Sequence, residues 1–207
     1  NFIPINVTAN DTGRGNNNIS VFIDFNRSLV GWWRMDEYNN TGIYDNSSYN
    51  NSGKFMGSMS RSNVVDGKLG KAMSFDGIND YVDAGNDSSL EIKVGSWGAW
   101  VKLNSKSKPG FMINKNSAYS LYYDNNSDWL KAAVFNPDGN FYYSGVGNPN
   151  LNQWYHLFAT YDGDFLNFYV DGKLTTPGDI PNGFINQSKT GLAIGSVLTA
   201  PTIYSFN

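Results

Sequence analysis

The stretch QWYHLFATYDGDFLNFYVDG, residues 153–172, decides the fold. It holds two runs of strand-forming residues, 154–161 and 165–170, joined by Asp162-Gly163, a dipeptide that supplies positive φ at tight hairpin turns. Because side chains alternate along a strand, one face of the second run should lie in a core. Leu166, Phe168 and Val170 form one of its two faces, and Phe165, Asn167 and Tyr169 form the other.

Similar runs recur along the chain about every ten residues, and five Asp-Gly pairs separate them. The composition agrees, since 29 Asn favour turns and only two Glu are available for the exposed faces of helices. We therefore predict an all-β fold, in which two antiparallel sheets pack as a jelly-roll sandwich. The expected strands are 72–75, 80–84, 96–103, 111–115, 119–123, 129–135, 141–144, 154–161, 165–170 and 191–196.

The first quarter of the chain has its own pattern. Residues 19–25 alternate and are predicted to form part of a hairpin that belongs to something upstream. Residues 29–36 are predicted as a further strand. The run 39–53 is rich in Asn, Ser and Gly, and is predicted as a surface loop.

Length and charge limit the function classes. A chain of 207 residues holds one full-sized domain, or one domain and a fragment. The net charge is -3 and the 15 Lys and Arg are scattered, which argues against nucleic acid or an anionic membrane surface as a partner. No run of about 18 apolar residues is present for membrane insertion. With no cysteine and one histidine, His156, the sequence excludes disulfides, thiol chemistry and paired-histidine sites.

Several segments together resemble the laminin G-like jelly-roll domains of the concanavalin A-like lectin/glucanase superfamily. They are LVGWWRMDE (29–37), VDGKLGKAMSFDGINDYV (65–82), WGAWVK (97–102), QWYHLFATYDG (153–163), LNFYVDG (166–172) and LAIGS (192–196). The resemblance implies a jelly-roll domain over 29–207 that lacks the usual last strand of the family, unless residues 19–25 take that place. Residues 1–28 are then the tail of a preceding domain, or a linker with a β-hairpin.

The resemblance also implies a structural calcium ion, which many relatives hold. Calcium needs six to eight oxygen ligands, and the turn 76–80 offers three oxygen-bearing side chains within five residues. We predict Asp76, Asn79 and Asp80 as the Ca²⁺ ligands, with Asp83 as a further candidate. The alternative is that the same residues simply form a hairpin turn.

Catalysis is not expected. Retaining glucanases of this fold carry a close pair of carboxylates, usually both Glu, and here the only Glu are Glu37 and Glu91. Asp162 and Asp164 flank a predicted turn. His156 is expected to be a half-buried histidine that bonds to a neighbouring carbonyl. No catalytic residue is therefore predicted.

Sugar binding fits the composition better, because aromatic rings stack on sugar rings while Asn and Asp bond to hydroxyl groups. Aromatic residues gather in the middle third of the chain, interleaved with Asp and Asn. The predicted ligand-binding residues are Tyr122, Tyr123, Trp129, Tyr142 and Tyr143. The alternative is that these rings belong to the core.

Taken together, the residues favour a noncatalytic recognition or adhesion module of a modular cell-surface or secreted protein. Its partner would be a glycan or a cell-surface protein, beside flanking domains of the parent chain. Two alternatives stay open: a structural spacer repeat of a surface stalk, and an accessory module of a polysaccharide-degrading enzyme. Ten glycosylation sequons favour a glycoprotein at the cell surface, although Asn-rich loops also generate sequons unaided. They begin at Asn6, Asn10, Asn18, Asn26, Asn39, Asn46, Asn50, Asn86, Asn125 and Asn186.

Overall fold

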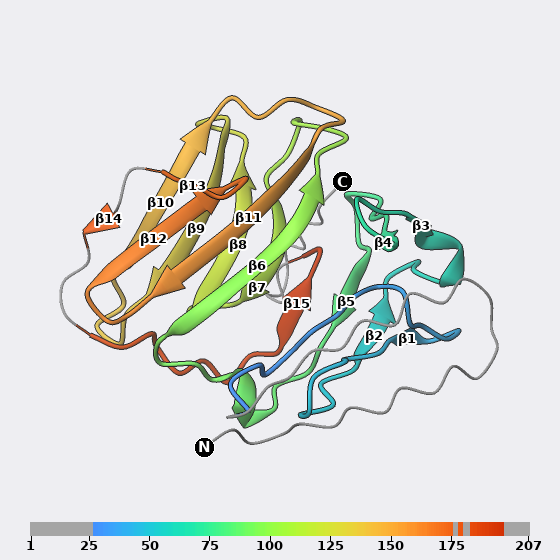
Figure 1. Ribbon diagram of the computed structural model, residues 1–207, viewed down its shortest axis with the longest axis horizontal. Coiled ribbons are helices and arrows are strands. Elements are labelled where there is room, and N and C mark those ends of the chain that lie inside the picture. Colours follow the sequence, from blue (N-terminus) through green and yellow to red (C-terminus); the bar gives the residue numbers. More distant parts are fainter. Residues whose placement is uncertain (1–26, 176–177, 180–182, 197–207) are drawn as a thin grey trace, which may run out of the picture.

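A computed structural model describes residues 27–175, 178–179 and 183–196, and it confirms the all-β sandwich (Figure 1). The strands are β1 (Gly42–Ile43), β2 (Gly53–Met56), β3 (Val64–Asp66), β4 (Lys71–Met73), β5 (Tyr81–Asp83), β6 (Gly95–Lys102), β7 (Gly110–Lys115), β8 (Tyr119–Asp124), β9 (Trp129–Phe135), β10 (Phe141–Gly147), β11 (Trp154–Tyr161), β12 (Phe165–Val170), β13 (Lys173–Leu174), β14 (Gly178–Asp179) and β15 (Leu192–Ile194). Two short 3-10 helices are η1 (Arg61–Asn63) and η2 (Ser88–Leu90).

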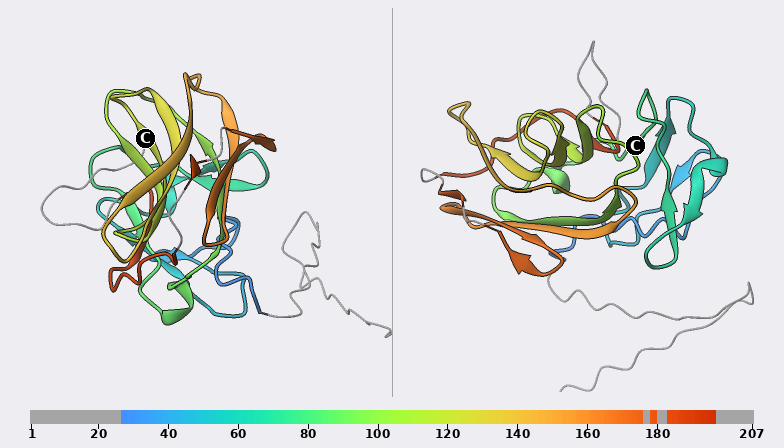
Figure 2. Two further views of the ribbon diagram at one scale, coloured as in Figure 1. Left: turned by 90° about the vertical axis from the view of Figure 1, so that its left-hand side faces the viewer. Right: turned by 90° about the horizontal axis from the view of Figure 1, so that it is seen from above.

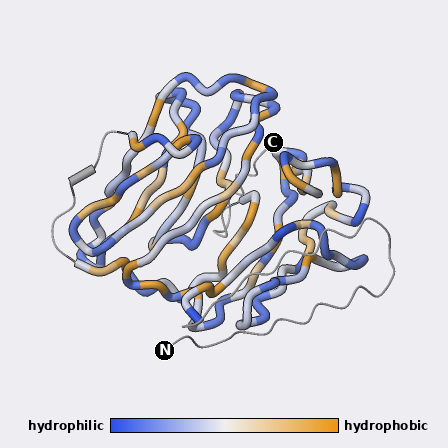
Figure 3. The backbone as a smooth tube through the Cα atoms, viewed as in Figure 1, coloured by the Kyte–Doolittle hydropathy of each residue, from blue (hydrophilic) through white to orange (hydrophobic). Residues whose placement is uncertain are grey.

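The strands form two packed antiparallel sheets, which Figure 2 shows from the side. The larger sheet has eight strands in the order β1-β2-β5-β15-β7-β8-β9-β10. The smaller sheet has the order β13-β12-β11-β6, with β14 paired to β12. A separate ribbon consists of β3 and β4. Loops that join the strands are mostly hydrophilic (Figure 3).

The predicted hairpin is the centre of the smaller sheet. β11 pairs with β12 on one side and with β6 on the other. At the turn, Asp162 Oδ1 accepts the backbone N–H groups of Asp164 (2.9 Å) and Phe165 (2.8 Å), and Gly163 has a φ of 111°. Leu166 and Phe168 are fully buried, so one face of β12 lies in the core as predicted, and it is the face that carries these two residues.

The core lies between the two sheets. β8 contributes Tyr119, Leu121 and Tyr123, and the smaller sheet contributes Trp97 from β6. The rings of Trp97 and Tyr119 are 5.3 Å apart, and the Trp97 indole N–H donates to the Ser120 carbonyl (3.1 Å). The alternation of buried and outward residues in β6 to β12 therefore fixes which side chains can form a surface site.

Two sequence predictions in the first quarter of the chain were wrong. Residues 29–36 do not form a strand, and the run 39–53 contains β1 and the first residue of β2. The carboxylate of Asp45, which is only 8% exposed, is hydrogen-bonded to several parts of this segment. It accepts the N–H groups of Trp32 (2.7 Å), Ser47 (2.8 Å) and Asn51 (2.7 Å), and the hydroxyl of Ser47 (2.6 Å).

The buried amide of Asn51 completes this arrangement. The side-chain Nδ2 of Asn51 donates to the Val30 carbonyl (2.8 Å), while the backbone carbonyl of Asn51 accepts the Trp33 indole N–H (2.7 Å). Backbone groups of the segment before β1 are thus satisfied by side chains as well as by neighbouring backbone, so a regular strand is not needed. Trp33 packs against the core.

The hairpin predicted over 19–25 and the question of a last strand fall outside the described residues. The strands predicted from residue 72 onward all occur, although β4, β5 and β15 are shorter than expected. In the described part of the chain, no helix has the length and apolar character needed to cross a membrane.

Candidate functional site

Alternation in the larger sheet turns a set of aromatic side chains away from the core. On β9, Leu130, Ala132 and Val134 belong to the core, and by alternation Trp129 and Lys131 point to the opposite side, where Trp129 is 40% exposed and Lys131 is 6% exposed. We call this side of β7 to β10 the outer aromatic face. Its residues are Phe111, Tyr122, Asp124, Trp129, Lys131, Phe135, Phe141 and Tyr143.

The rings on the outer aromatic face form a continuous row across four strands. Phe111 and Tyr122 stack with centroids 5.2 Å apart and planes 18° apart. Phe141 then lies 6.5 Å from Tyr122, and it also contacts Phe135 (4.8 Å) and Tyr143 (5.9 Å). Trp129, Phe141 and Tyr143 are each 40–47% exposed. A connected apolar surface of this kind on a sheet is typical of a ligand-contacting face.

Trp129 lies across the backbone of β10 because that strand has glycine at two outward positions. Gly147 pairs with Trp129, and Gly145 pairs with Lys131. A Cβ on Gly147 would come 2.7 Å from the Trp129 Nε1, and a Cβ on Gly145 would come 3.0 Å from its Cε3. The first contact is shorter than a real Cβ makes, and the second is tighter than nearly all real Cβ contacts. The two glycines therefore let one side of the indole rest on the strand while the other side stays exposed.

A lysine lies among the rings. Lys131 Nζ is 4.3 Å from the centroid of the Tyr143 ring and 5.9 Å from that of Trp129, and it pairs with Asp124 Oδ2 at 2.7 Å. The hydrogen bond from Lys131 is the main cause that lowers the pKa of Asp124. Burial raises the pKa of Tyr122, so this residue stays a neutral phenol. The face thus combines rings with a matched ion pair and has little net charge.

The structure divides the five predicted ligand-binding residues into two groups. Tyr122, Trp129 and Tyr143 lie on the outer aromatic face. Tyr123 is a correction: it is 2% exposed in the core, where its hydroxyl donates to Asp128 Oδ1 (2.8 Å) and burial raises its pKa to about 12. Tyr142 is also a correction, because it packs against the core from the inner side of β10.

Sequence reasoning missed Phe111, Phe135, Phe141 and Lys131 as members of the face. The alternation within β9 and β10 could have found the last three, because positions 129, 131 and 135 share one side, as do 141 and 143. Phe111 comes from a strand earlier in the chain. Only the pairing of β7 with β8 brings it opposite Tyr122.

The three predicted calcium ligands do not converge. Asp76 Oδ1 accepts the backbone N–H groups of Ile78, Asn79 and Asp80, at 2.8, 3.1 and 3.2 Å. Burial acts to raise the pKa of Asp76, but these bonds outweigh it and lower the pKa. Asn79 is exposed.

Asp80 points elsewhere and is 1% exposed. Its Oδ1 accepts the N–H (3.0 Å) and hydroxyl (2.7 Å) of Ser58, and its Oδ2 accepts Asn63 Nδ2 (3.1 Å). Within 27–175, 178–179 and 183–196, no group of three or more His, Cys, Asp or Glu side chains is placed to hold a metal. These residues do not fit a calcium site as they lie, and the calcium prediction stays a prediction.

The two glutamates and the histidine considered for catalysis belong to different elements of the fold. Glu91 Oε1 pairs with the buried Lys115 Nζ at 3.1 Å, and Glu37 is an exposed residue before β1. Asp162 caps the β11–β12 turn. His156 is half-buried and points outward from β11, and its ring lies 5.0 Å from that of Trp100.

Comparisons with known proteins bear on the fold. Similar solved structures include the binding domain of Paraclostridial Mosquitocidal Protein 1, with a TM-score of 0.62 and 14% identity over 83% of this chain and 44% of that chain. Another is Domain 4 of AbnA, a GH43 extracellular arabinanase from Geobacillus stearothermophilus, in complex with arabinotriose, with a TM-score of 0.56 and 18% identity over 79% of this chain and 82% of that one.

The botulinum neurotoxin serotype D binding domain is also similar, with a TM-score of 0.56 and 15% identity over 81% of this chain and 43% of the toxin chain. The chain thus spans less than half the length of the two toxin domains. At these identities the likeness shows the fold alone. A search of curated proteins found no match.

A family model is more specific. The model described as the concanavalin A-like lectin/glucanases superfamily, of laminin G type, matches residues 76–201, which is more than half of the chain. The matched segment includes every strand of the sandwich from β5 to β15. The chain therefore belongs to the concanavalin A-like lectin/glucanase superfamily.

Proposed function

We propose that this chain is a noncatalytic carbohydrate-binding module of a secreted or cell-surface protein, and that its outer aromatic face binds a neutral glycan. The observation that carries the proposal is the position of Trp129, whose indole rests on Gly145 and Gly147 with one side exposed. A flat ring held by its strand stacks on the C–H face of a sugar ring without first losing side-chain freedom.

The polar groups on the same face suit a neutral ligand. Lys131 is only 6% exposed and its ammonium is bonded to Asp124, so Asp124 is the partner of the pair whose carboxylate oxygens can bond to sugar hydroxyls beside the rings. Because the two charges are paired at 2.7 Å, an acidic sugar would find no unmatched cation on this face. The ion pair therefore favours neutral over charged glycans.

The exposure of the rings favours glycan binding over the alternative that the chain is a structural spacer. A spacer gains nothing from a connected row of exposed rings, since apolar patches on a surface promote association. Here Trp129, Phe141 and Tyr143 are exposed at 40% or more. The alternative of an accessory module in a polysaccharide-degrading enzyme is one form of the same proposal, and the AbnA domain with bound arabinotriose supports it.

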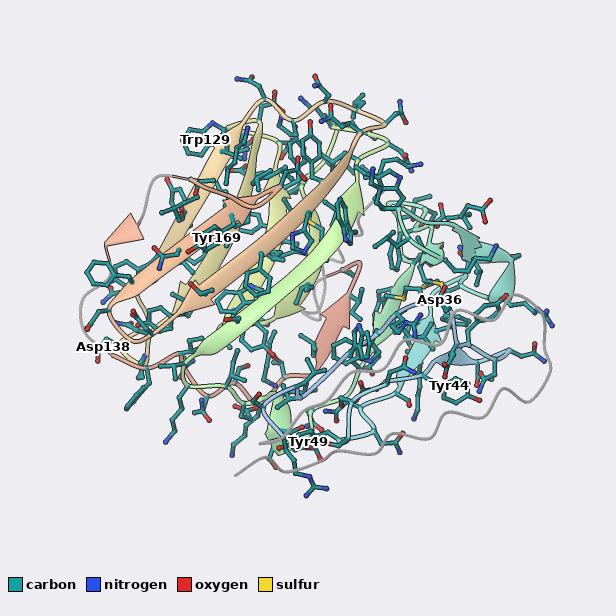
Figure 4. All side chains as sticks on the ribbon, viewed as in Figure 1. Asp36, Tyr44, Tyr49, Trp129, Asp138 and Tyr169 are labelled. Atoms are coloured by element: carbon teal, nitrogen blue, oxygen red, sulfur yellow. The ribbon has the colours of Figure 1, made fainter. Side chains whose placement is uncertain are left out.

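The test is calorimetric titration with neutral oligosaccharides of arabinan, xylan, β-glucan and galactan. We expect one class to bind and Trp129→Ala to weaken that binding at least tenfold, because one stacked ring contributes about 1–3 kcal/mol by analogy with base stacking on aromatic side chains. The matched control is Tyr44→Ala, a ring of similar exposure (44%) at the opposite end of the molecule (Figure 4). Equal losses in both variants, or no binding by any class, would refute the proposal.

A further inference from the structure

The smaller sheet carries a second aromatic surface, on the opposite side of the sandwich from the outer aromatic face. We propose that this surface binds an acidic glycan, one whose rings carry carboxylate or sulfate groups. We call it the basic aromatic face and define it by Lys68, Trp100, Lys102, Trp154, His156 and Phe158. Figure 4 labels Tyr169, which lies beside it on β12.

Cross-strand pairing holds these residues in a row. Trp154 lies opposite Lys102, His156 opposite Trp100, and Phe158 opposite Gly98. The His156 ring is 5.0 Å from Trp100 and 6.1 Å from Phe158, and it is nearly parallel to the latter (14°). A Cβ on Gly98 would come 2.6 Å from Phe158 Cδ2, so the phenyl ring lies over the glycine. Trp100 and Phe158 are 42% and 37% exposed.

Two cations lie over the tryptophans of this row. Lys102 Nζ is 5.1 Å from the centroid of the Trp154 ring, and Lys68 Nζ is 5.8 Å from that of Trp100. Neither lysine is within 4.0 Å of a carboxylate of the described residues, unlike Lys131 on the other sheet. The outward positions of β6, β11 and β12 hold no Asp or Glu.

The positive charge is therefore local and unmatched on a chain whose net charge is -3. Asp171, in the turn after β12, uses its Oδ1 to accept the backbone N–H of His156 (2.8 Å). An anionic group that met the two ammonium groups would gain charge-assisted hydrogen bonds. The rings beside them would stack on the attached sugar, and this combination favours an acidic glycan over a neutral one.

A depression of about 330 Å³ adjoins the row, at the low end of the size range of ligand sites. It is lined by His156, Phe158, Thr160, Tyr169 and Gly172. The hydroxyls of Thr160 and Tyr169 are suited to sugar hydroxyls. This proposal is independent of the neutral-glycan site, because it concerns another sheet and the opposite charge requirement.

The experiment follows the six tryptophan indole N–H signals in ¹H–¹⁵N spectra. The probes are hexagalacturonate, its neutral methyl ester and a heparin-derived sulfated hexasaccharide at low salt. We expect the Trp100 and Trp154 signals to shift with hexagalacturonate, with the sulfated probe, or with both, and not with the ester. The two acidic arms distinguish carboxylate from sulfate. Shifts with neither acidic probe, or equal shifts with the ester, would overturn the proposal.

Variants test the charge requirement. In Lys68→Gln/Lys102→Gln we expect the Kd of the acidic probe to rise at least about tenfold, equivalent to about 1.4 kcal/mol. The control is Lys54→Gln/Lys189→Gln, which makes the same change in net charge at two exposed lysines outside the smaller sheet. An equal loss in the control would show nonspecific attraction and refute the site. Tighter binding of a short single-stranded DNA oligonucleotide than of every acidic glycan would also refute it.

Discussion

Gly147 on β10 lies directly opposite Trp129 on β9, and the missing side chain at position 147 is what allows the indole to rest on the strand. Any Cβ there would come 2.7 Å from Trp129 Nε1. The orientation of the Trp129 ring on the outer aromatic face is thus set by a glycine on the neighbouring strand, not by the tryptophan alone.

This relationship predicts the effect of Gly147→Val. The new side chain should push the indole off β10, and glycan binding should weaken by about tenfold, which corresponds to about 1.4 kcal/mol. Strand stability should change little, because valine favours strands. Calorimetry measures the binding, and tryptophan fluorescence reports the greater exposure of Trp129. Val146→Thr, a nearly isosteric change at the preceding residue, should leave both unchanged; an identical loss there would contradict the explanation.

The two faces of β12 predict different stability effects for substitutions of two phenylalanines on this strand. Phe168 is fully buried whereas Phe165 is 48% exposed. We expect Phe168→Ala to lower the free energy of unfolding by about 3–5 kcal/mol, since it leaves a cavity in the core. Phe165→Ala should cost about 1 kcal/mol or less. Urea denaturation of both variants checks this, and similar losses would contradict the assigned faces.

The hydrogen bonds to the Asp45 carboxylate should stabilise the fold, although the sequence suggested that this segment is a surface loop. Asp45→Ala removes the acceptor of four hydrogen bonds, and we expect a loss of about 2–4 kcal/mol. Asp138→Ala serves as the control, because Asp138 is exposed in the turn between β9 and β10. Hydrogen exchange should show the loss centred on residues 29–53. An effect no larger than that of the control would refute the role of Asp45.

A substitution of Asp80 distinguishes a purely structural role of this residue from a role as a calcium ligand. The groups that bind its carboxylate belong to Ser58 and Asn63, so Asp80→Asn should lower the melting temperature equally in calcium and in chelator. If calcium binds instead, the ion stabilises the wild type by mass action and the difference between variants appears only with calcium present. Thermal melts in both buffers distinguish the two outcomes.

The Asp124–Lys131 pair predicts a pH dependence. The hydrogen bond from Lys131 lowers the pKa of Asp124 in the folded protein below about 3.9, the value in an unfolded chain. The pair therefore stabilises the fold fully above about pH 4, and this stabilisation is lost as the pH falls through the lower, folded pKa. Asp124→Asn should remove part of the loss of stability below pH 4. Unfolding curves of both proteins between pH 2 and 7 test this; parallel profiles would contradict it.

Much of the fold follows from the sequence, because alternation and Asp-Gly turns are local signals. Both β11 and β12 could be placed from residues 153–172 alone. The segment 29–53 could not, since its structure depends on Asp45 and Asn51 being buried among backbone groups, and composition alone suggests that both are exposed. Three of the five predicted ligand-binding residues lie on the outer face. Tyr123 and Tyr142 were misplaced because adjacent strand residues point to opposite sides.

The central claim is that Trp129 and its neighbours form a binding face for a neutral glycan. The most direct measurement is a titration of the ¹⁵N-labelled protein with the neutral oligosaccharides named above, following the indole N–H signals. The account predicts that one class of oligosaccharide shifts the Trp129 signal and leaves that of the buried Trp97 unchanged. If every class leaves Trp129 unmoved, or shifts only tryptophans away from the outer aromatic face, the account is contradicted.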